Sequence, residues 1–148
     1  MERKNAKEGD VVVTRVGTIG LSARIPKECD GGTISDNLIR LRFDNKNLNS
    51  FYTALYLGSI LGRSLMIGNS RGSVQQRLNQ ETLKEIIFPI PKMDIQNKIA
   101  EIVLISNSKR KESKLLLNIA KHGVEMAIEK DEKEAQGWID SELYLRGA

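Results

Sequence analysis

The sequence has very few of the residues that metal centres and covalent crosslinks require. Cys29 is its only cysteine and His122 its only histidine. A single cysteine cannot form an intramolecular disulfide, and one Cys with one His cannot supply the four ligands of a usual zinc site. We therefore expect no metal in this chain, and a structural or solvent-exposed role for His122.

Long apolar runs are missing as well. No stretch of about 18 consecutive apolar residues is present, so we expect no membrane-spanning helix. The first eight residues contain no apolar segment of the kind found in export signals. Together with the single cysteine, these features predict a cytoplasmic protein.

The sequence also lacks the motifs of the obvious enzyme classes. Its three prolines, Pro26, Pro89 and Pro91, are not adjacent, so the Asn/Asp-Pro-Pro-aromatic motif of adenine methyltransferases is absent. The glycines at positions 17 and 20 fit neither of the common phosphate-cradling patterns. We predict a non-catalytic protein with no catalytic residues and no cofactor of its own.

Charge is distributed unevenly along the chain, whose formal net charge is +4. Residues 1–92 contain 14 Lys/Arg and 9 Asp/Glu, whereas the remainder contains 9 and 10. No acidic residue lies between Asp44 and Glu81, a window that includes Lys46, Arg63, Arg71 and Arg77. Such a window is typical of a surface that binds nucleic-acid phosphates. A solvated face that happens to lack acids explains it equally well.

Residues 1–92 mix strand-like and helical patterns, which predicts an α+β fold. The β-branched run at residues 11–14 favours a strand, and residues 21–25 are its expected hairpin partner. The alternation at residues 39–43 predicts a half-buried strand. Asn49 and Ser50 are expected to cap a helix over residues 51–65, and residues 86–88 to form a further strand.

Residues 93–135 favour one long, coiled-coil-like helix. Positions from Ile95 to Ala127 alternate in steps of four and three, which is a heptad pattern with apolar ends and a polar middle. Residues 106–114 in that middle could instead form a turn between two helices. Residues 136–148 lose the periodicity and are expected to fray. Because a long helix must bury its apolar stripe, a second copy of the chain is a candidate partner.

The segment at residues 69–79 is unusually polar and contains no acid. It has two residues each of Arg, Gln, Asn and Ser. Arg can chelate the edge of guanine and Gln or Asn that of adenine, while Ser binds phosphate. The alternative is an ordinary polar loop in which Asn79 serves only as a helix N-cap.

Four segments carry recognisable motifs, namely residues 9–20 (GDVVVTRVGTIG), 34–41 (ISDNLIRL), 72–79 (GSVQQRLN) and 86–100 (IIFPIPKMDIQNKIA). In this order they resemble the second half of the target-recognition domain of type I restriction-modification specificity subunits. Each motif alone is degenerate, but four in order followed by a helix are fairly specific.

The resemblance implies a partial DNA target-recognition domain at residues 1–92, then a helix at 93–135 for pairing and for docking methyltransferase subunits. It implies double-stranded DNA contacts by Arg15, Thr18, Arg71, Ser73, Gln75, Gln76, Arg77 and Asn79. It also implies that Gln96, Ile99, Ile102, Leu116 and Ala120 belong to the helical join and pairing face. S-adenosylmethionine, Mg²⁺ and ATP would belong to partner subunits. The alternatives are a non-catalytic, helix-mediated assembly module and the recognition tail of a fused N6-adenine DNA methyltransferase.

Overall fold

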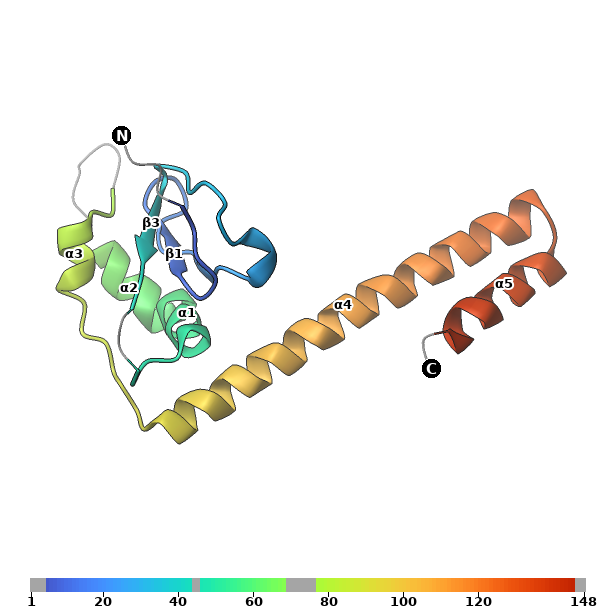
Figure 1. Ribbon diagram of the computed structural model, residues 1–148. Coiled ribbons are helices and arrows are strands. Elements are labelled where there is room, and N and C mark those ends of the chain that lie inside the picture. Colours follow the sequence, from blue (N-terminus) through green and yellow to red (C-terminus); the bar gives the residue numbers. More distant parts are fainter. Residues whose placement is uncertain (1–4, 44–45, 69–76, 146–148) are drawn as a thin grey trace. The chain divides into compact units, whose positions relative to one another are not determined.

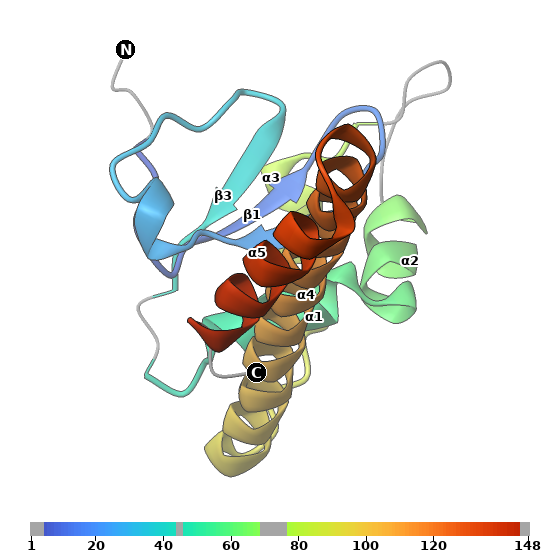
Figure 2. The same ribbon diagram turned by 90° about the vertical axis from the view of Figure 1, so that its right-hand side faces the viewer.

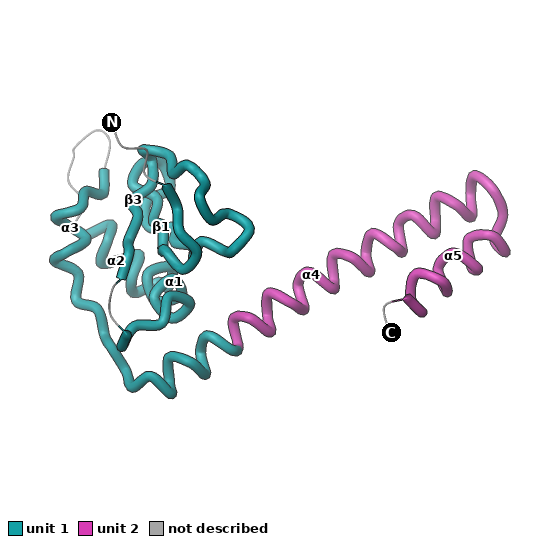
Figure 3. The backbone as a smooth tube through the Cα atoms, viewed as in Figure 1, with its two compact units in different colours: residues 1–101 teal, residues 102–148 magenta. Residues whose placement is uncertain are grey.

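The computed structural model describes residues 5–43, 46–68 and 77–145 and separates into two compact units. Unit 1 comprises residues Met1–Glu101 and unit 2 residues Ile102–Ala148 (Figure 3). Within the described ranges, no helix has both the length and the apolar character needed to cross a membrane.

An antiparallel sheet of three strands lies in unit 1 (Figure 1). Strand β1 (Val11–Thr14) is central, between β2 (Ser22–Arg24) and β3 (Leu38–Leu41). In the register, Val12 pairs with Ala23 on one side and with Arg40 on the other. A short 3-10 helix, η1 (Lys27–Cys29), follows β2. The strands confirm the hairpin and the third strand expected from the sequence.

Alternate side chains of β1 enter two different hydrophobic clusters. Val12 packs with Ala6 and Ile34 on one face of the sheet. Val11 and Val13 belong to the larger cluster on the other face, whose remaining buried members are Ile19, Ile39, Leu57, Met66 and Leu78. This period of two is the expected geometry of a strand that is buried on both faces.

Two helices, α1 (Ser50–Gly58) and α2 (Ile60–Gly68), replace the single helix expected over residues 51–65. The chain is extended at Ser59, whose hydroxyl donates to Tyr56 O (2.6 Å) and accepts from Gly62 N (3.2 Å). A Cβ at position 62 would collide with the backbone of α1, so the break depends on a glycine there. The expected N-cap is confirmed, because Asn49 Oδ1 accepts from Phe51 N at 2.9 Å.

The strand expected at residues 86–88 is not formed. Two tyrosines of α1 hold this segment instead: Tyr56 donates its hydroxyl to Ile87 O (3.0 Å) and Tyr52 donates to Pro89 O (2.9 Å). Phe88 makes edge-on ring contacts with both tyrosines. Side-chain hydroxyls thus take the carbonyls that a strand would have offered to a neighbouring strand.

Helix α4 (Met93–Glu129) runs without interruption through residues 106–114, so the turn considered there is wrong. It ends at Glu129, six residues before the expected end. Residues 136–144, expected to fray, belong to a further helix, α5 (Glu132–Tyr144). Asp131 caps α5 by accepting a hydrogen bond from Glu134 N at 2.7 Å.

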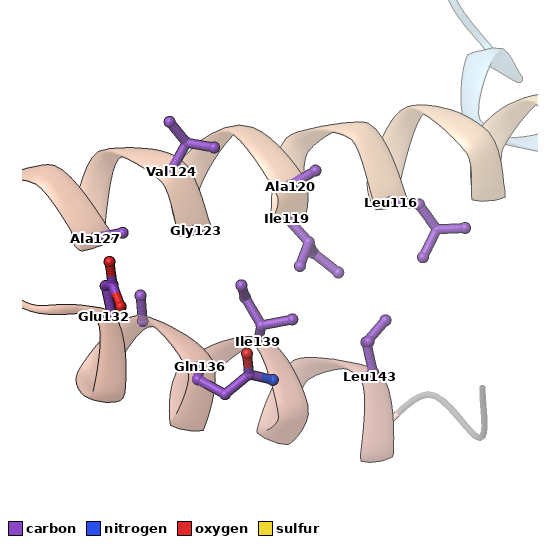
Figure 4. A pocket seen from close by; sticks show the side chains of 11 residues that line it. Leu116, Ile119, Ala120, Gly123, Val124, Ala127, Glu132, Gln136, Ile139 and Leu143 are labelled. Carbon is purple, nitrogen blue, oxygen red and sulfur yellow. The ribbon is translucent and has the colours of Figure 1, made fainter.

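Within unit 2, α5 packs against the C-terminal part of α4 (Figure 4). A Cβ on Gly123 would lie 2.6 Å from Ile139 Cδ1, so the two helices meet closely at this glycine. The rings of His122 and Trp138 are in edge-on contact, with centroids 4.6 Å apart. This contact gives His122 the structural role expected from the sequence.

Candidate nucleic-acid interface

Three arginines of unit 1 are engaged in contacts within the protein. Arg24 donates to Ser50 (3.0 Å) and Glu8 (3.1 Å) and lies over the ring of Phe51. Arg40 donates to Asn5 O at 2.6 Å. Arg42 is the third. These side chains hold strands and loops together, so their charges serve the fold.

The pair Arg42 and Asp10 is bidentate. Arg42 Nε and Nη2 lie 2.8 and 2.7 Å from the two carboxylate oxygens of buried Asp10, which also accepts from Lys7 N at 2.9 Å. The hydrogen bonds from Arg42 lower the pKa of Asp10, outweighing the opposite effect of burial, and the carboxylate raises the pKa of Arg42. Asp10 is therefore ionised at neutral pH, and its charge is compensated inside the fold.

The β1–β2 turn is built on two glycines and a threonine. Gly17 and Gly20 have φ angles of +73° and +80°, a region that side chains with a Cβ rarely adopt. Thr14 donates its hydroxyl to Thr18 O and accepts from Leu21 N at 3.0 Å. Thr18 is exposed on this turn.

Arg15 and Arg77 are brought beside each other in the backbone, although 62 positions separate them. Leu78 N donates to Arg15 O at 3.0 Å, while Arg15 N donates to Asn37 O at 2.9 Å. Leu78 is fully buried in the core, and its neighbour Arg77 is exposed. The structure thus places Arg15, Thr18 and Arg77 at one end of unit 1.

Asn79 is the N-cap of α3 (Gln80–Lys84), where its Oδ1 accepts from Thr82 N at 2.7 Å. Bidentate recognition of adenine needs the oxygen and the nitrogen of the same amide. The cap uses one lone pair of the oxygen and holds the side chain at the start of α3, so the orientation of the Asn79 amide is fixed by the helix. The other predicted contacts in this segment, Arg71, Ser73, Gln75 and Gln76, lie outside the described residues.

Arg63 was not singled out as a site residue from the sequence. It lies in α2, and its Cγ is 3.4 Å from the place where a Cβ on Gly20 would be, so α2 lies directly beside the β1–β2 turn (Figure 2). The Nε atoms of Arg63 and Arg15 are both buried and have no hydrogen-bond partner among the described residues. The only sequence signal for Arg63 was its place in the acid-free window.

Gln96, which the resemblance assigns to the helical join and pairing face, lies where α4 joins the rest of unit 1. Its side chain is fully buried in unit 1. Oε1 accepts from Asn49 N (2.9 Å), and Nε2 donates to Asn47 O (2.9 Å) and Pro91 O (2.8 Å). Gln96 therefore joins the first turns of α4 to the start of α1, and it offers no surface to a second chain.

The remaining predicted pairing residues fall into two groups. Ile99 is half-buried in unit 1, whereas Ile102 is 66% exposed. Leu116 and Ala120 line a groove between α4 and α5, opposite residues that include Ile139 and Leu143 (Figure 4). Part of the stripe that was expected to face another chain thus faces α5 of the same chain.

Comparison with known proteins identifies the class to which this fold and basic surface belong. The family model for the type I restriction modification DNA specificity domain matches residues 2–112. The chain belongs to this family, which confirms the resemblance found in the sequence.

A solved structure agrees with this assignment at the level of the fold. The chain is similar to the HsdS subunit from Thermoanaerobacter tengcongensis, with a TM-score of 0.59 and 15% sequence identity. The match covers 82% of this chain and 32% of that subunit, so the chain spans about a third of its length. No match was found among curated proteins.

Proposed function

We propose that unit 1 contacts double-stranded DNA through the end of the globule that carries Arg15, Thr18 and Arg77. The proposal rests on a difference among the arginines of unit 1: some have a partner within the protein and others do not. Arg24, Arg40 and Arg42 are bound within the protein, whereas no ion pair or side-chain hydrogen bond of Arg15 or Arg77 is found among the described residues. Guanidinium groups that no carboxylate of the described residues neutralises suit a polyanion.

The polar segment 69–76 immediately precedes Arg77 in the chain. We propose that Arg71, Ser73, Gln75 and Gln76 take part in reading the target there, since their side chains are those that recognise base edges and phosphates. The cap at Asn79 supports a positioning role for that residue, because it fixes where the segment ends.

We further propose that the chain works as a non-catalytic component in the cytoplasm, with methyltransferase subunits as partners. S-adenosylmethionine, Mg²⁺ and ATP would then be bound by those partners. The family to which the chain belongs supports this reading, and the exposed apolar residues of α4 supply surface on which a partner helix can pack.

The decisive experiment is fluorescence anisotropy of the chain with random-sequence duplex DNA at several salt concentrations. The logarithm of the association constant should fall linearly with that of the salt, with a slope of about −0.9 for each phosphate contacted. Arg77→Gln should weaken binding to all sequences. Arg110→Gln, an exposed arginine in unit 2, is the matched control and should bind like the wild type. No binding of the wild type at low salt would contradict the proposal.

Helix-mediated assembly is the second candidate function, and a specific observation favours it. Leu117, Val124 and Ile128 on α4 are 55%, 60% and 79% exposed and follow one another at helical spacing. Sedimentation analysis over a range of concentrations tests it. Self-association that Leu117→Lys abolishes would support it, while a monomer at high concentration would leave a different subunit as the partner.

A further inference from the structure

Two guanidinium groups in unit 1 have a donor that the fold itself leaves unused. The Nε atoms of Arg15 and Arg63 are buried, and neither has a hydrogen-bond partner among the described residues. A buried donor without a partner costs about 1–3 kcal/mol, and more when the group is charged. Two such donors therefore destabilise unit 1 unless another group accepts hydrogen bonds from them.

The two arginines lie on the same side of the sheet, next to the β1–β2 turn. The pairing of β1 with β3 continues past Thr14, since Arg15 N donates to Asn37 O. Alternation along β1 then places Arg15 on the face of Val13. Val13 shares its core cluster with Met66 of α2, and Arg63 is one turn earlier in that helix.

The β1–β2 turn is open at Gly17 and closely packed at Gly20. A Cβ on Gly17 would meet nothing within 4 Å, and Gly20 brings the backbone close to Arg63 and Met66. The acid-free window from residue 45 to residue 80 includes Arg63, so its own segment supplies no carboxylate to neutralise it.

A phosphate group supplies the hydrogen-bond acceptors and the negative charge that the two guanidinium groups lack. The planar guanidinium fork matches two oxygens of a phosphate, and charge-assisted bonds of this kind are stronger than neutral ones. A single carboxylate and a single phosphodiester each offer two oxygens to one guanidinium fork, but a nucleic-acid strand also supplies neighbouring phosphates for a second arginine.

We propose that Arg15 and Arg63 form a phosphodiester-binding site on the DNA backbone at the β1–β2 turn. This inference rests on the proposed function and adds Arg63 of α2 to the interface. The site positions the protein on the duplex and carries no base preference, because phosphates are the same at every step. Specificity then belongs to other residues of the interface.

The test compares Arg63→Gln and Arg15→Gln with wild type and with the control Arg110→Gln, using cognate-selected and random duplexes. Each variant should bind both duplexes on the order of tenfold more weakly, because a hydrogen-bonded charged contact is lost. The salt slope should become less steep by about 0.9 per arginine removed. Arg63→Lys should keep most of the slope and lose part of the affinity.

A second measurement uses the wild-type chain alone, labelled with ¹⁵N. The Nε–H signals of the two arginines, assigned by through-bond correlation in the wild-type chain, should shift and exchange more slowly with solvent when duplex DNA is added. This readout does not depend on whether a variant folds. It also separates a DNA contact from an internal structural role.

The outcomes distinguish the two levels of the proposal. If the wild type fails to bind any duplex, the proposed function is wrong. If the wild type binds but both Gln variants keep its affinity and slope, DNA recognition stands and this site is wrong. A variant with a lowered melting temperature, unchanged affinity and unshifted Nε–H signals in the wild type would likewise overturn the site and make the arginines structural.

Discussion

Units 1 and 2 differ in how far each buries its own side chains. In the described part of the chain, the four buried polar residues, Asp10, Thr53, Thr82 and Gln96, lie in unit 1, as do most of the buried apolar ones. Among the described residues, unit 2 buries only Ile119, Gly123 and Ala135. Unit 1 has a core made by a sheet and two helices, whereas unit 2 has a single contact between two helices.

This difference has a physical consequence for stability and for binding. Two helices cannot cover an apolar stripe that turns around the long helix, so side chains such as Val124 stay exposed (Figure 4). Helical stability in proteins comes mainly from packing of such faces. Unit 1 is thus expected to be stable by itself, while unit 2 gains most from a further partner.

The largest effect on stability should come from a substitution that creates a cavity in the core of unit 1. Leu78→Ala removes a fully buried side chain and should lower the free energy of unfolding by about 2–5 kcal/mol. Leu117→Ala, the same change at an exposed position of α4, should cost less than about 1 kcal/mol. Urea unfolding of both variants makes the comparison. Equal losses would mean that α4 is buried in solution.

The next effect concerns the start of α4, which belongs to unit 1. Gln96→Leu keeps the approximate volume but leaves Asn49 N, Asn47 O and Pro91 O without this partner. We expect a loss of about 2–4 kcal/mol, because several polar groups are deprived of a hydrogen bond at once. Hydrogen exchange at the Asn49 amide should accelerate, while the amides of α5 should keep the wild-type rate. A uniform change in both units would contradict the division of α4 between them.

A pH-dependent contribution in acid is expected from the Asp10–Arg42 pair of unit 1. The pKa of Asp10 is lowered in the folded state, chiefly by the hydrogen bonds from Arg42, so the ionised form stabilises the fold. This contribution is complete above the ordinary value of 3.8 and is lost as the pH falls through the lowered pKa. Asp10→Asn should therefore cost about 1.5–3 kcal/mol at neutral pH and progressively less in acid. Urea unfolding at pH 7 and pH 3 measures both values, and a pH-independent difference would contradict the assignment.

Two glycines test how closely α5 packs on α4. Gly123→Val places a side chain where Ile139 already lies and should weaken the docking of α5 by about 1–3 kcal/mol. Gly137→Ala adds a methyl group where nothing lies within 4 Å and should stabilise the helix by about 0.5–1 kcal/mol. Trp138, the single tryptophan, contacts His122 and reports docking through its fluorescence. If the two variants changed the signal alike, the helices would not meet at Gly123.

The sequence was most informative where local chemistry decides the structure. The β-branched run of β1, the turn at Gly17 and Gly20 and the cap at Asn49 were each predicted, because each depends on neighbouring residues. The break at Ser59 was not predicted, since Gly62 matters only through its contact with the backbone of α1. The strand at 86–88 is not formed for a similar reason, because tyrosine hydroxyls more than 30 positions away bind the carbonyls of Ile87 and of Pro89 just beyond it.

In the candidate site, too, local features were predicted and contacts between distant residues were not. Arg15, Thr18 and Arg77 were found through motifs, but the sequence did not show that Arg77 lies beside Arg15. That proximity depends on one backbone hydrogen bond between distant residues. Arg63 carried no motif, and its position against Gly20 follows from the packing of α2. For α5, the loss of the heptad pattern was taken to mean a frayed end, so the N-cap at Asp131 was not recognised.

That signal permits the smallest and most direct comparison, because each unit contains a helix whose Asx N-cap accepts from the amide three positions later. Asn79 caps α3 and Asp131 caps α5, each accepting from the amide three positions later at 2.7 Å. Replacing either by Ala should cost about 1 kcal/mol. In unit 1, Leu78 anchors the cap in the core, so Asn79→Ala should lower global stability without local fraying. In unit 2, Asp131→Ala should instead release the first turn of α5, seen as faster exchange of the Glu134 amide with little change in global unfolding. Asn79→Ser restores the cap and is the control. If it also restored full DNA affinity, the amide of Asn79 would be excluded as a base-reading group and its role would be to position the segment that precedes α3.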